Sequence, residues 1–291
     1  MPKTDNVVKL PDGRNLGYAE YGDLLGKPIF YFHGWPSSRL EGVNFHTAGL
    51  KLGARIISPD RPGLGLSDFK KGFAIRHWPE DVEVLADRLN LDRFAVVGVS
   101  SGAPYAFACA RFMTGRLRAA GSVSGIGPLD LPNPGRYLFK QELQLVRLAQ
   151  KAPWLARPLL RRETNKLKRD PAKAMAELDK NSPEVDKLVF RDHPELSATL
   201  AQGVGECVRQ GTRGAIAGIA LEGRPWGFRL EEIMMKFYVW HGEVDNLVYP
   251  ATARYLVERL PNGVLFLCPG EAHLSTVINR AEEIVGTLIA E

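Results

Sequence analysis

The chain has 291 residues, of which 45% are hydrophobic and 24% charged, with a net charge of +5 and 29 glycines. This composition excludes a disordered chain, and glycines without a three-residue period exclude a collagen-like one. Because no run approaches the ~18–20 apolar residues of a membrane helix and the first residues lack the apolar stretch of a secretory signal, we expect a soluble, cytoplasmic protein.

The first 130 residues alternate short β-branched runs with helical patterns, which is typical of a parallel sheet with crossover helices. Two predicted strands, 7–10 and 16–21, flank Asp12-Gly13, a hairpin signal. The other predicted strands are residues 29–32, 55–58, 94–97, 121–124, 237–240 and 264–268. The predicted helices between them are residues 79–91, 103–113, 251–260 and 281–289.

A stretch of different texture, residues 128–230, separates the two parts of this pattern. Its helical patterns are short and interrupted by prolines, and it contains no strand-rich run. We therefore predict an α/β fold with a mostly parallel central sheet flanked by helices. Residues 1–127 and 231–291 form its core domain, and residues 128–230 form an inserted helical cap.

The most informative local feature is Gly98-Val99-Ser100-Ser101-Gly102, between a predicted strand and a predicted helix. A serine at such a sharp turn is held in a strained conformation, with its hydroxyl above the sheet. Side chains at positions 98 and 102 would collide across the turn, which explains both glycines. The alternative is a loop that only packs a helix against a strand. We predict that Ser100 is a nucleophile.

A serine hydroxyl needs a base to remove its proton and a third group to orient that base. Of the six histidines, His273 is best placed, in a loop after strand 264–268 and before the last helix. Asp245 follows strand 237–240, at the sheet edge where functional groups collect. Glu243 is the close alternative to Asp245, and Asp130 is a more remote one.

Negative charge that develops on the substrate requires hydrogen-bond donors. We predict that the backbone N–H groups of Ser101 and Trp35 supply them. Trp35 lies in His33-Gly34-Trp35-Pro36, directly after strand 29–32. We therefore assign Gly34, Trp35 and Ser101 to the oxyanion hole and the substrate-binding region.

These motifs give the chain a resemblance to the α/β-hydrolase superfamily, in its capped branch of esterases, lipases and perhydrolases. His33-Gly34-Trp35-Pro36 is similar to that family's HGxP loop, and residues 60–67, DRPGLGLS, are similar to its DxPGxGxS loop. The order Ser100, Asp245, His273 also matches. The resemblance covers residues 1–127 and 231–291. Ser101 departs from it, since many relatives carry a bulky apolar residue there.

The resemblance implies a serine hydrolase of carboxylic esters or related acyl compounds of small apolar molecules, of the esterase type. Two alternatives stay open. One is a ligand-binding receptor that keeps the pocket without turnover. The other uses the same triad for lactone or carbon–carbon hydrolysis, acyl transfer or perhydrolysis. An aspartate nucleophile, as in family epoxide hydrolases, is disfavoured because Ser100 occupies the elbow.

The remaining sequence signals predict no further chemistry. The chain has no P-loop, no dinucleotide-binding fingerprint and no HExxH motif, so we predict no cofactor and no metal. Three widely spaced cysteines, Cys109, Cys207 and Cys268, favour reduced core thiols over disulfides. The sequence leaves open whether the protein is a homodimer.

The positive charge is concentrated in residues 131–230, which hold 18 Lys and Arg against 11 Asp and Glu. This segment lacks the modules of nucleic-acid-binding proteins, so we predict a solvated basic face and no nucleic-acid partner. Its aromatic residues are candidates for pocket lining or for core; they are Tyr137, Phe139, Trp154, Trp226 and Phe228.

Overall fold

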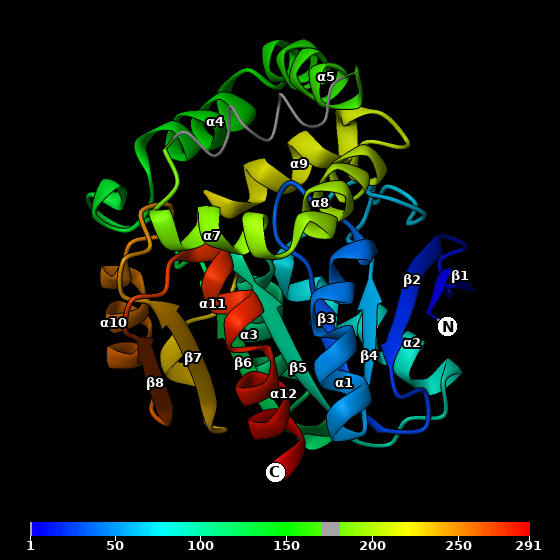
Figure 1. Ribbon diagram of the computed structural model, residues 1–291. Helices are drawn as coiled ribbons and strands as arrows, with labels where there is room; N and C mark the ends of the chain where they lie inside the picture. The colour runs from blue at the N-terminus through cyan, green and yellow to red at the C-terminus, as the bar shows by residue number, and fades with distance from the viewer. Residues whose placement is uncertain (1, 170–180) are drawn as a thin grey trace.

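The computed structural model describes residues 2–169 and 181–291, and an eight-stranded sheet forms its centre (Figure 1). The strand order is β1-β2-β4-β3-β5-β6-β7-β8. Strands β4, β3, β5, β6, β7 and β8 run parallel, whereas β2 pairs antiparallel with both β1 and β4. The predicted mostly parallel sheet is therefore confirmed.

The strands are short and lie close to the predicted runs. They are β1 Lys3–Lys9, β2 Asn15–Gly22, β3 Lys27–Phe32, β4 Ala54–Pro59, β5 Phe94–Val99, β6 Leu117–Val123, β7 Phe237–Gly242 and β8 Gly263–Cys268. β5 is buried along its whole length. A continuous apolar run is what a strand covered on both faces of a parallel sheet requires.

Helices cover both faces of the sheet and give the protein two main apolar cores. On one face, α2 (Trp78–Arg88), α3 (Ala103–Phe112) and α10 (Pro250–Arg259) bury side chains such as Leu85, Phe107 and Leu256. On the other face, α1 (His46–Leu52) and α12 (Ala281–Ala290) bury Ala48 and Ile284. The three cysteines are free and buried, as predicted.

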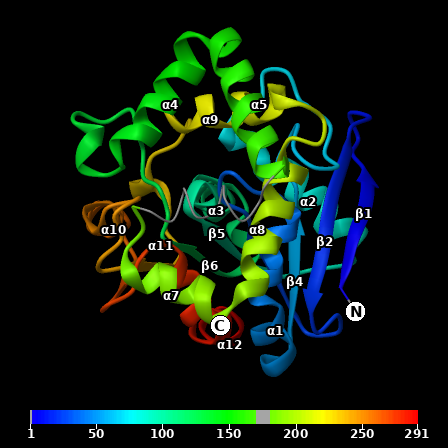
Figure 2. The ribbon, with the colours of Figure 1, turned by 45° about the horizontal axis from the view of Figure 1, so that its top comes forward.

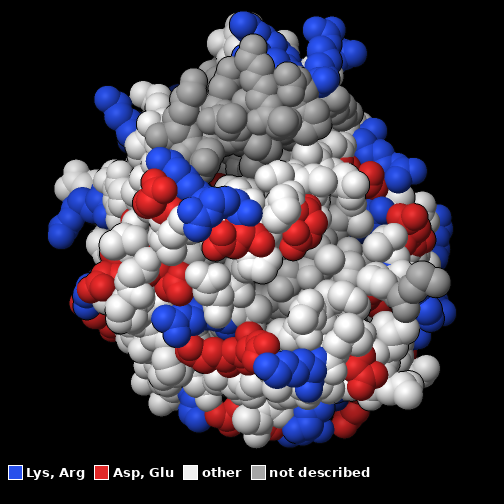
Figure 3. Space-filling view, in the orientation of Figure 1, with Lys and Arg blue, Asp and Glu red and all other residues white. Residues whose placement is uncertain are grey.

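Further helices lie between β6 and β7, in the stretch predicted as an insertion; we call them the insertion helices. They are α4 Lys140–Lys151, α5 Pro153–Arg169, α7 Glu184–Asp192, α8 Pro194–Cys207 and α9 Thr212–Glu222. They lie above the carboxyl ends of the parallel strands (Figure 1) and surround the region over α3 and β5 (Figure 2). In Figure 3, Lys and Arg stand out at the upper edge, where α5 lies.

One expectation about local structure is wrong. His273 was predicted in a loop, but it is the first residue of a short helix, α11 (His273–Asn279). The helix forms because the Ser275 hydroxyl accepts a hydrogen bond from the backbone N–H of Ala272, at 2.7 Å, which satisfies a free donor at the helix start.

Helix α9 rests on the loop after β4 through main-chain atoms. A Cβ on Gly214 would collide with the carbonyl group of Gly63, and a Cβ on Gly63 would come within 2.8 Å of the Gly214 Cα. Gly63 also has a φ of +82°, which favours glycine. The two glycines thus allow the insertion to approach the core more closely than side chains would permit.

This contact predicts opposite effects for two glycines of α9. Gly214→Ala should lower the free energy of unfolding by about 1–3 kcal/mol, because the new methyl group meets backbone. Gly218→Ala is the matched control, since a Cβ there meets nothing within 4 Å, and it should raise stability by about 0.5–1 kcal/mol. Urea denaturation measures both values; equal effects would contradict the proposed packing.

Candidate active site

Ser100 lies directly after β5, at the turn into α3, where the sequence predicted a strained elbow. It has a φ of +51°, a region that non-glycine residues rarely occupy, and it is 8% exposed. A Cβ on Gly98 would collide with the backbone of Gly102, and a Cβ on Gly102 with that of Phe32. The predicted collision across the turn is therefore confirmed for Gly98, whereas Gly102 is required for a different reason, because the turn lies against the end of β3.

His273 and Asp245 meet at the same edge of the sheet, although 28 residues separate them in the sequence. The Nδ1 atom of His273 lies 2.8 Å from Oδ2 of Asp245. The other oxygen of Asp245 accepts hydrogen bonds from the backbone N–H groups of Leu247 and Val248, at 2.9 and 3.0 Å. These bonds fix the carboxylate. Because the carboxylate binds Nδ1 of the imidazole, the other ring nitrogen, Nε2, is left to accept a proton.

Charge and burial act in opposite directions on this pair. Burial lowers the pKa of His273, but the charge and hydrogen bond of Asp245, together with the charges of Asp186 and Glu41, outweigh it, so the pKa lies above its ordinary value. Burial raises the pKa of Asp245, and the charge and hydrogen bond of His273, the charge of His241 and the N–H of Leu247 together outweigh that effect and leave it lowered. A second imidazole, that of His241, lies 3.4 Å from Asp245 and is completely buried.

The loop after β6 is hydrogen-bonded to both Ser100 and His273. The hydroxyl of Ser124, just after β6, donates a hydrogen bond of 3.0 Å to the backbone carbonyl of His273, and the N–H of Ile126 donates one of 3.2 Å to the carbonyl of Ser100. The hydrogen bonds of the described residues do not include one between the Ser100 hydroxyl and the His273 ring. The elbow and the His–Asp pair are thus neighbours through the loop after β6.

The loop after β3 carries Gly34 and Trp35 beside the elbow. A Cβ on Gly34 would lie 3.2 Å from Cβ of Ser100. The N–H of Gly34 donates to Oε1 of Glu41 at 2.9 Å, which commits that donor to the protein. Within residues 2–169 and 181–291, the N–H of Trp35 donates no hydrogen bond, so it is free to bind an oxyanion.

Arg61, in the DRPG loop after β4, joins the two loops that carry the predicted donors. Its Nη2 donates to the carbonyl of Gly34 at 2.9 Å and its Nη1 to that of Ser101 at 3.2 Å. The guanidinium is buried and lies 5.1 Å from the centre of the Tyr105 ring. Arg61 therefore fixes the separation of the Gly34 and Ser101 main chains, a role that the DRPG motif does not reveal from the sequence.

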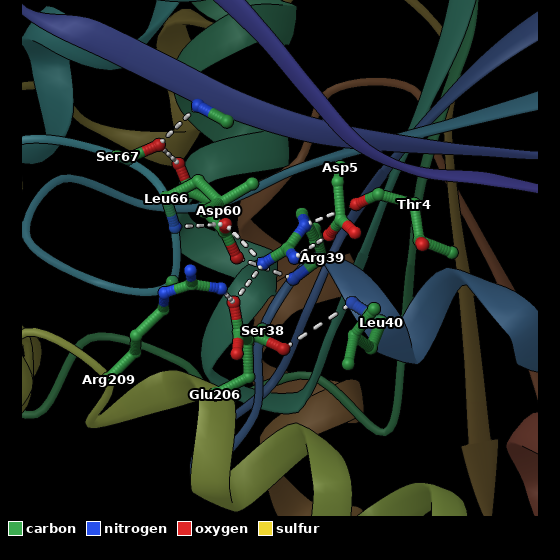
Figure 4. Close-up of polar contacts among 12 residues, drawn as sticks. Thr4, Asp5, Ser38, Arg39, Leu40, Asp60, Leu66, Ser67, Glu206 and Arg209 are labelled. Carbon is green, nitrogen blue, oxygen red and sulfur yellow. Dashed lines mark hydrogen bonds and ion pairs between the residues drawn. The ribbon is translucent and has the colours of Figure 1, made fainter.

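A buried ion pair next to these loops holds them to the rest of the protein (Figure 4). Arg39 donates to Asp60 from its backbone N–H at 2.7 Å and from Nη1 at 3.1 Å. The same guanidinium binds Asp5 of β1 at 2.6 Å and Glu206 of α8 at 2.7 Å. Burial raises the pKa of Asp60 to about 6, against the opposing effect of Arg39.

Two carboxyl groups of the insertion helices face the site. Glu222, at the end of α9, is buried near Ser101, and burial raises its pKa to about 8, with Arg61 opposing and Glu142 reinforcing the shift. Its Oε1 atom is buried without a hydrogen-bond partner. Glu142 of α4 lies near His273, and burial raises its pKa as well. No sequence signal pointed to either residue, since no motif covers the insertion.

The three candidate acids differ in their exposure to solvent. Asp245 is 3% exposed, whereas Glu243 and Asp130 are exposed to solvent.

Among the described residues, no group of three His, Cys, Asp or Glu side chains is arranged to hold a metal ion. None of the helices in the described ranges is long and apolar enough to cross a membrane.

The chain belongs to the α/β-hydrolase fold family, whose model matches residues 27–276. It is 34% identical over 125 residues to a non-heme chloroperoxidase of Streptomyces lividans, a stretch that covers 42% of this chain and 45% of that protein. It is 30% identical over 124 residues to a bifunctional esterase/perhydrolase of Acinetobacter calcoaceticus, with coverage of 42% and 45%. The chain thus matches less than half the length of these relatives.

The fold itself extends over the whole chain. A thermophilic esterase from Thermogutta terrifontis superposes with a TM-score of 0.67 at 19% sequence identity, covering 100% of this chain and 97% of that one. An enol-lactonase from Burkholderia xenovorans superposes with a TM-score of 0.68 at 18% identity, with coverage of 98% of each chain. At this identity the similarity establishes the architecture.

The buried carboxyl of Glu222 predicts a pH-dependent stability. In the folded state it keeps its proton up to about pH 8, whereas in the unfolded chain it ionises near pH 4.3. Stability therefore falls as the pH rises between these values. Glu222→Gln removes this penalty, so it should raise the free energy of unfolding on the order of 5 kcal/mol at pH 8.5 and change it little at pH 4.

Chemical denaturation at both pH values measures this difference. Glu184→Gln, on an exposed position of α7, is the control and should show no such pH dependence. A gain for Glu222→Gln that is the same at pH 4 and pH 8.5 would show that the carboxyl does not retain its proton in the folded state.

Proposed function

We propose that the protein is a serine hydrolase that cleaves a carboxylic ester, or a related acyl bond, of a small apolar substrate. The observation that carries the proposal is the strained Ser100 beside a His273–Asp245 pair joined at 2.8 Å. A buried carboxylate on Nδ1 leaves Nε2 as the proton acceptor and stabilises the imidazolium that forms. The named esterase and perhydrolase relatives support the same class of chemistry.

In the proposed mechanism, the Ser100 oxygen attacks the substrate carbonyl while His273 accepts the hydroxyl proton. The N–H groups of Trp35 and Ser101 donate hydrogen bonds to the oxygen that becomes negative. His273 then returns the proton to the leaving alcohol, and the acyl group stays on Ser100. A water molecule, deprotonated by His273, releases the acid and restores the enzyme.

The insertion helices are proposed to act as a cap over this centre, with residues 128–230 as one unit. They place the carboxyl groups of Glu142 and Glu222 beside His273 and Ser101, and Trp35 packs against two of their apolar clusters. A cap of this kind excludes water and selects substrates by shape.

Perhydrolysis is the second candidate, because the matched relatives include an esterase/perhydrolase and a non-heme chloroperoxidase. Here hydrogen peroxide replaces water in the attack on the acyl enzyme, and the product is a peroxy acid. Formation of peracetic acid from acetate ester and peroxide would distinguish it from simple hydrolysis.

Replacement of the nucleophile tests the proposal directly. Ser100→Ala should lower kcat for p-nitrophenyl acetate by at least about 10⁴-fold while the fold remains intact, since no other group can form the acyl enzyme. A fluorophosphonate probe should label the wild type at Ser100. Ser101→Ala keeps its backbone N–H and should still be labelled at Ser100.

Two results would contradict this assignment. Labelling mapped to a different serine would move the nucleophile elsewhere. Absence of labelling and turnover, together with ligand-dependent binding of a partner, would favour a receptor that retains the fold.

The pH profile tests His273 as the base. Because Asp245 holds the pKa of His273 above about 6.5, kcat/KM should fall about tenfold per pH unit on the acid side of a midpoint above 6.5. Asp245→Asn should move this midpoint to lower pH and reduce kcat by about 10³–10⁴-fold. A flat profile between pH 5 and 8 would exclude His273 from this role.

A further inference from the structure

A cavity of about 240 Å³ lies between the insertion helices and the loop after β4. Its walls come from α4, α5 and α9 above and from residues 61–73 and Tyr105 below. Pockets for small molecules commonly measure about 300–1,000 Å³, so this one suits a small ligand. Ser100 and His273 are not among its lining residues, but Arg61, which bonds to Gly34 and Ser101, is, so the cavity adjoins the candidate catalytic centre.

All the charged side chains among the described lining residues are positive. Five cationic residues line it, and no described lining residue is acidic; they are Arg61, Lys70, Arg157, Arg213 and Arg224. Arg157, Arg213 and Arg224 are exposed to solvent, and within the described ranges they form no ion pair. Lys70 is the exception, with Asp12 and Glu80 each 3.9 Å away. The described lining of the cavity therefore concentrates positive charge, which favours an anion.

One of these cations is buried. Arg61 is 4% exposed, and its Nε atom has no hydrogen-bond partner. The Glu222 carboxyl near Arg61 does not offset this charge at neutral pH, since it holds its proton.

The rest of the lining is apolar and aromatic. Arg213 lies over the Phe69 ring at 4.2 Å, and Arg61 over the Tyr105 ring at 5.1 Å. Phe73 stacks on Tyr105, with ring planes 13° apart. Arginines held by aromatic rings are oriented, so they lose less freedom when they bind a ligand. Such a wall fits a ligand with a charged end and a flat or aliphatic body.

We propose that this cavity is a binding site for a small organic carboxylate, with its carboxylate bound by the arginines of the lining and its apolar body against Phe69 and Phe73. Guanidinium groups bind carboxylates through paired hydrogen bonds. The basic face predicted from residues 131–230 is thus in part the wall of a site. The carboxylate is either an acidic end of the substrate or a separate molecule, and both have the same chemistry.

Isothermal titration calorimetry with phenylacetate, and with its neutral isostere phenylacetamide, tests the site in the full-length protein. Phenylacetate should bind, and phenylacetamide should bind at least about tenfold more weakly. Arg213→Gln and Arg224→Gln should each raise the Kd of phenylacetate about tenfold, equivalent to about 1.4 kcal/mol. Arg162→Gln, an exposed arginine of α5 that does not line the cavity, should leave it unchanged.

Thermal unfolding of each unliganded variant shows that the fold is intact, and the two arginine variants provide independent tests. Equal binding of the acid and the amide, or an unchanged Kd in both variants, would overturn the proposal. These outcomes do not depend on ester hydrolysis, so a protein without turnover would still reveal the site.

Addition of phenylacetate to p-nitrophenyl acetate hydrolysis separates the two sources of the carboxylate. Competitive inhibition that is lost in Arg213→Gln indicates that the cavity holds the acidic end of a substrate. Turnover that is unchanged or stimulated at saturating phenylacetate indicates a separate ligand.

Discussion

The buried ion pair between Arg39 and Asp60 is the interaction on which the arrangement of the site depends. Two charges buried together are stable only when hydrogen bonds satisfy both, and here Asp60 also accepts from the backbone of Leu66 at 2.8 Å. The pair connects the loops after β3 and β4, and Arg39 extends the connection to β1 and, through Glu206, to α8. Loops without regular structure thereby acquire the fixed positions that Trp35 and Arg61 need.

Those fixed loops explain why one edge of the sheet gathers so many functional groups. Parallel strands end at the same edge, and each loop that follows is short enough to keep its side chains there. Ser100 projects from β5, Asp245 follows β7 and His273 follows β8, while Gly34 and Arg61 follow β3 and β4. Hydrogen bonds between these loops, rather than apolar packing, set their separations, because the atoms concerned are mainly backbone carbonyl and N–H groups.

Much of this could be predicted from the sequence, because strong local signals marked it. The continuous apolar run of β5, the glycines on either side of Ser100 and the order of Ser100, Asp245 and His273 each have a steric or chemical cause within a few residues. The bridging role of Arg61 depends on contacts between distant segments, whereas the helix at His273 depends on the local hydrogen bond between Ala272 and Ser275, which no motif marked. The insertion was least predictable: Trp154 is 73% exposed and Trp226 belongs to the main core, whereas the cavity is lined by arginines.

The meeting of Gly63 and Gly214 has a consequence for how this protein could acquire new selectivity. Because α9 contacts the loop after β4 through main-chain atoms, the distance between α9 and the sheet does not depend on the side chains that α9 presents to a ligand. Exchanges at positions 213 and 217, which are not buried, would therefore alter the shape and polarity presented to a bound molecule while the platform beneath stays in register. Ligand preference and architectural integrity are, on this helix, separable properties.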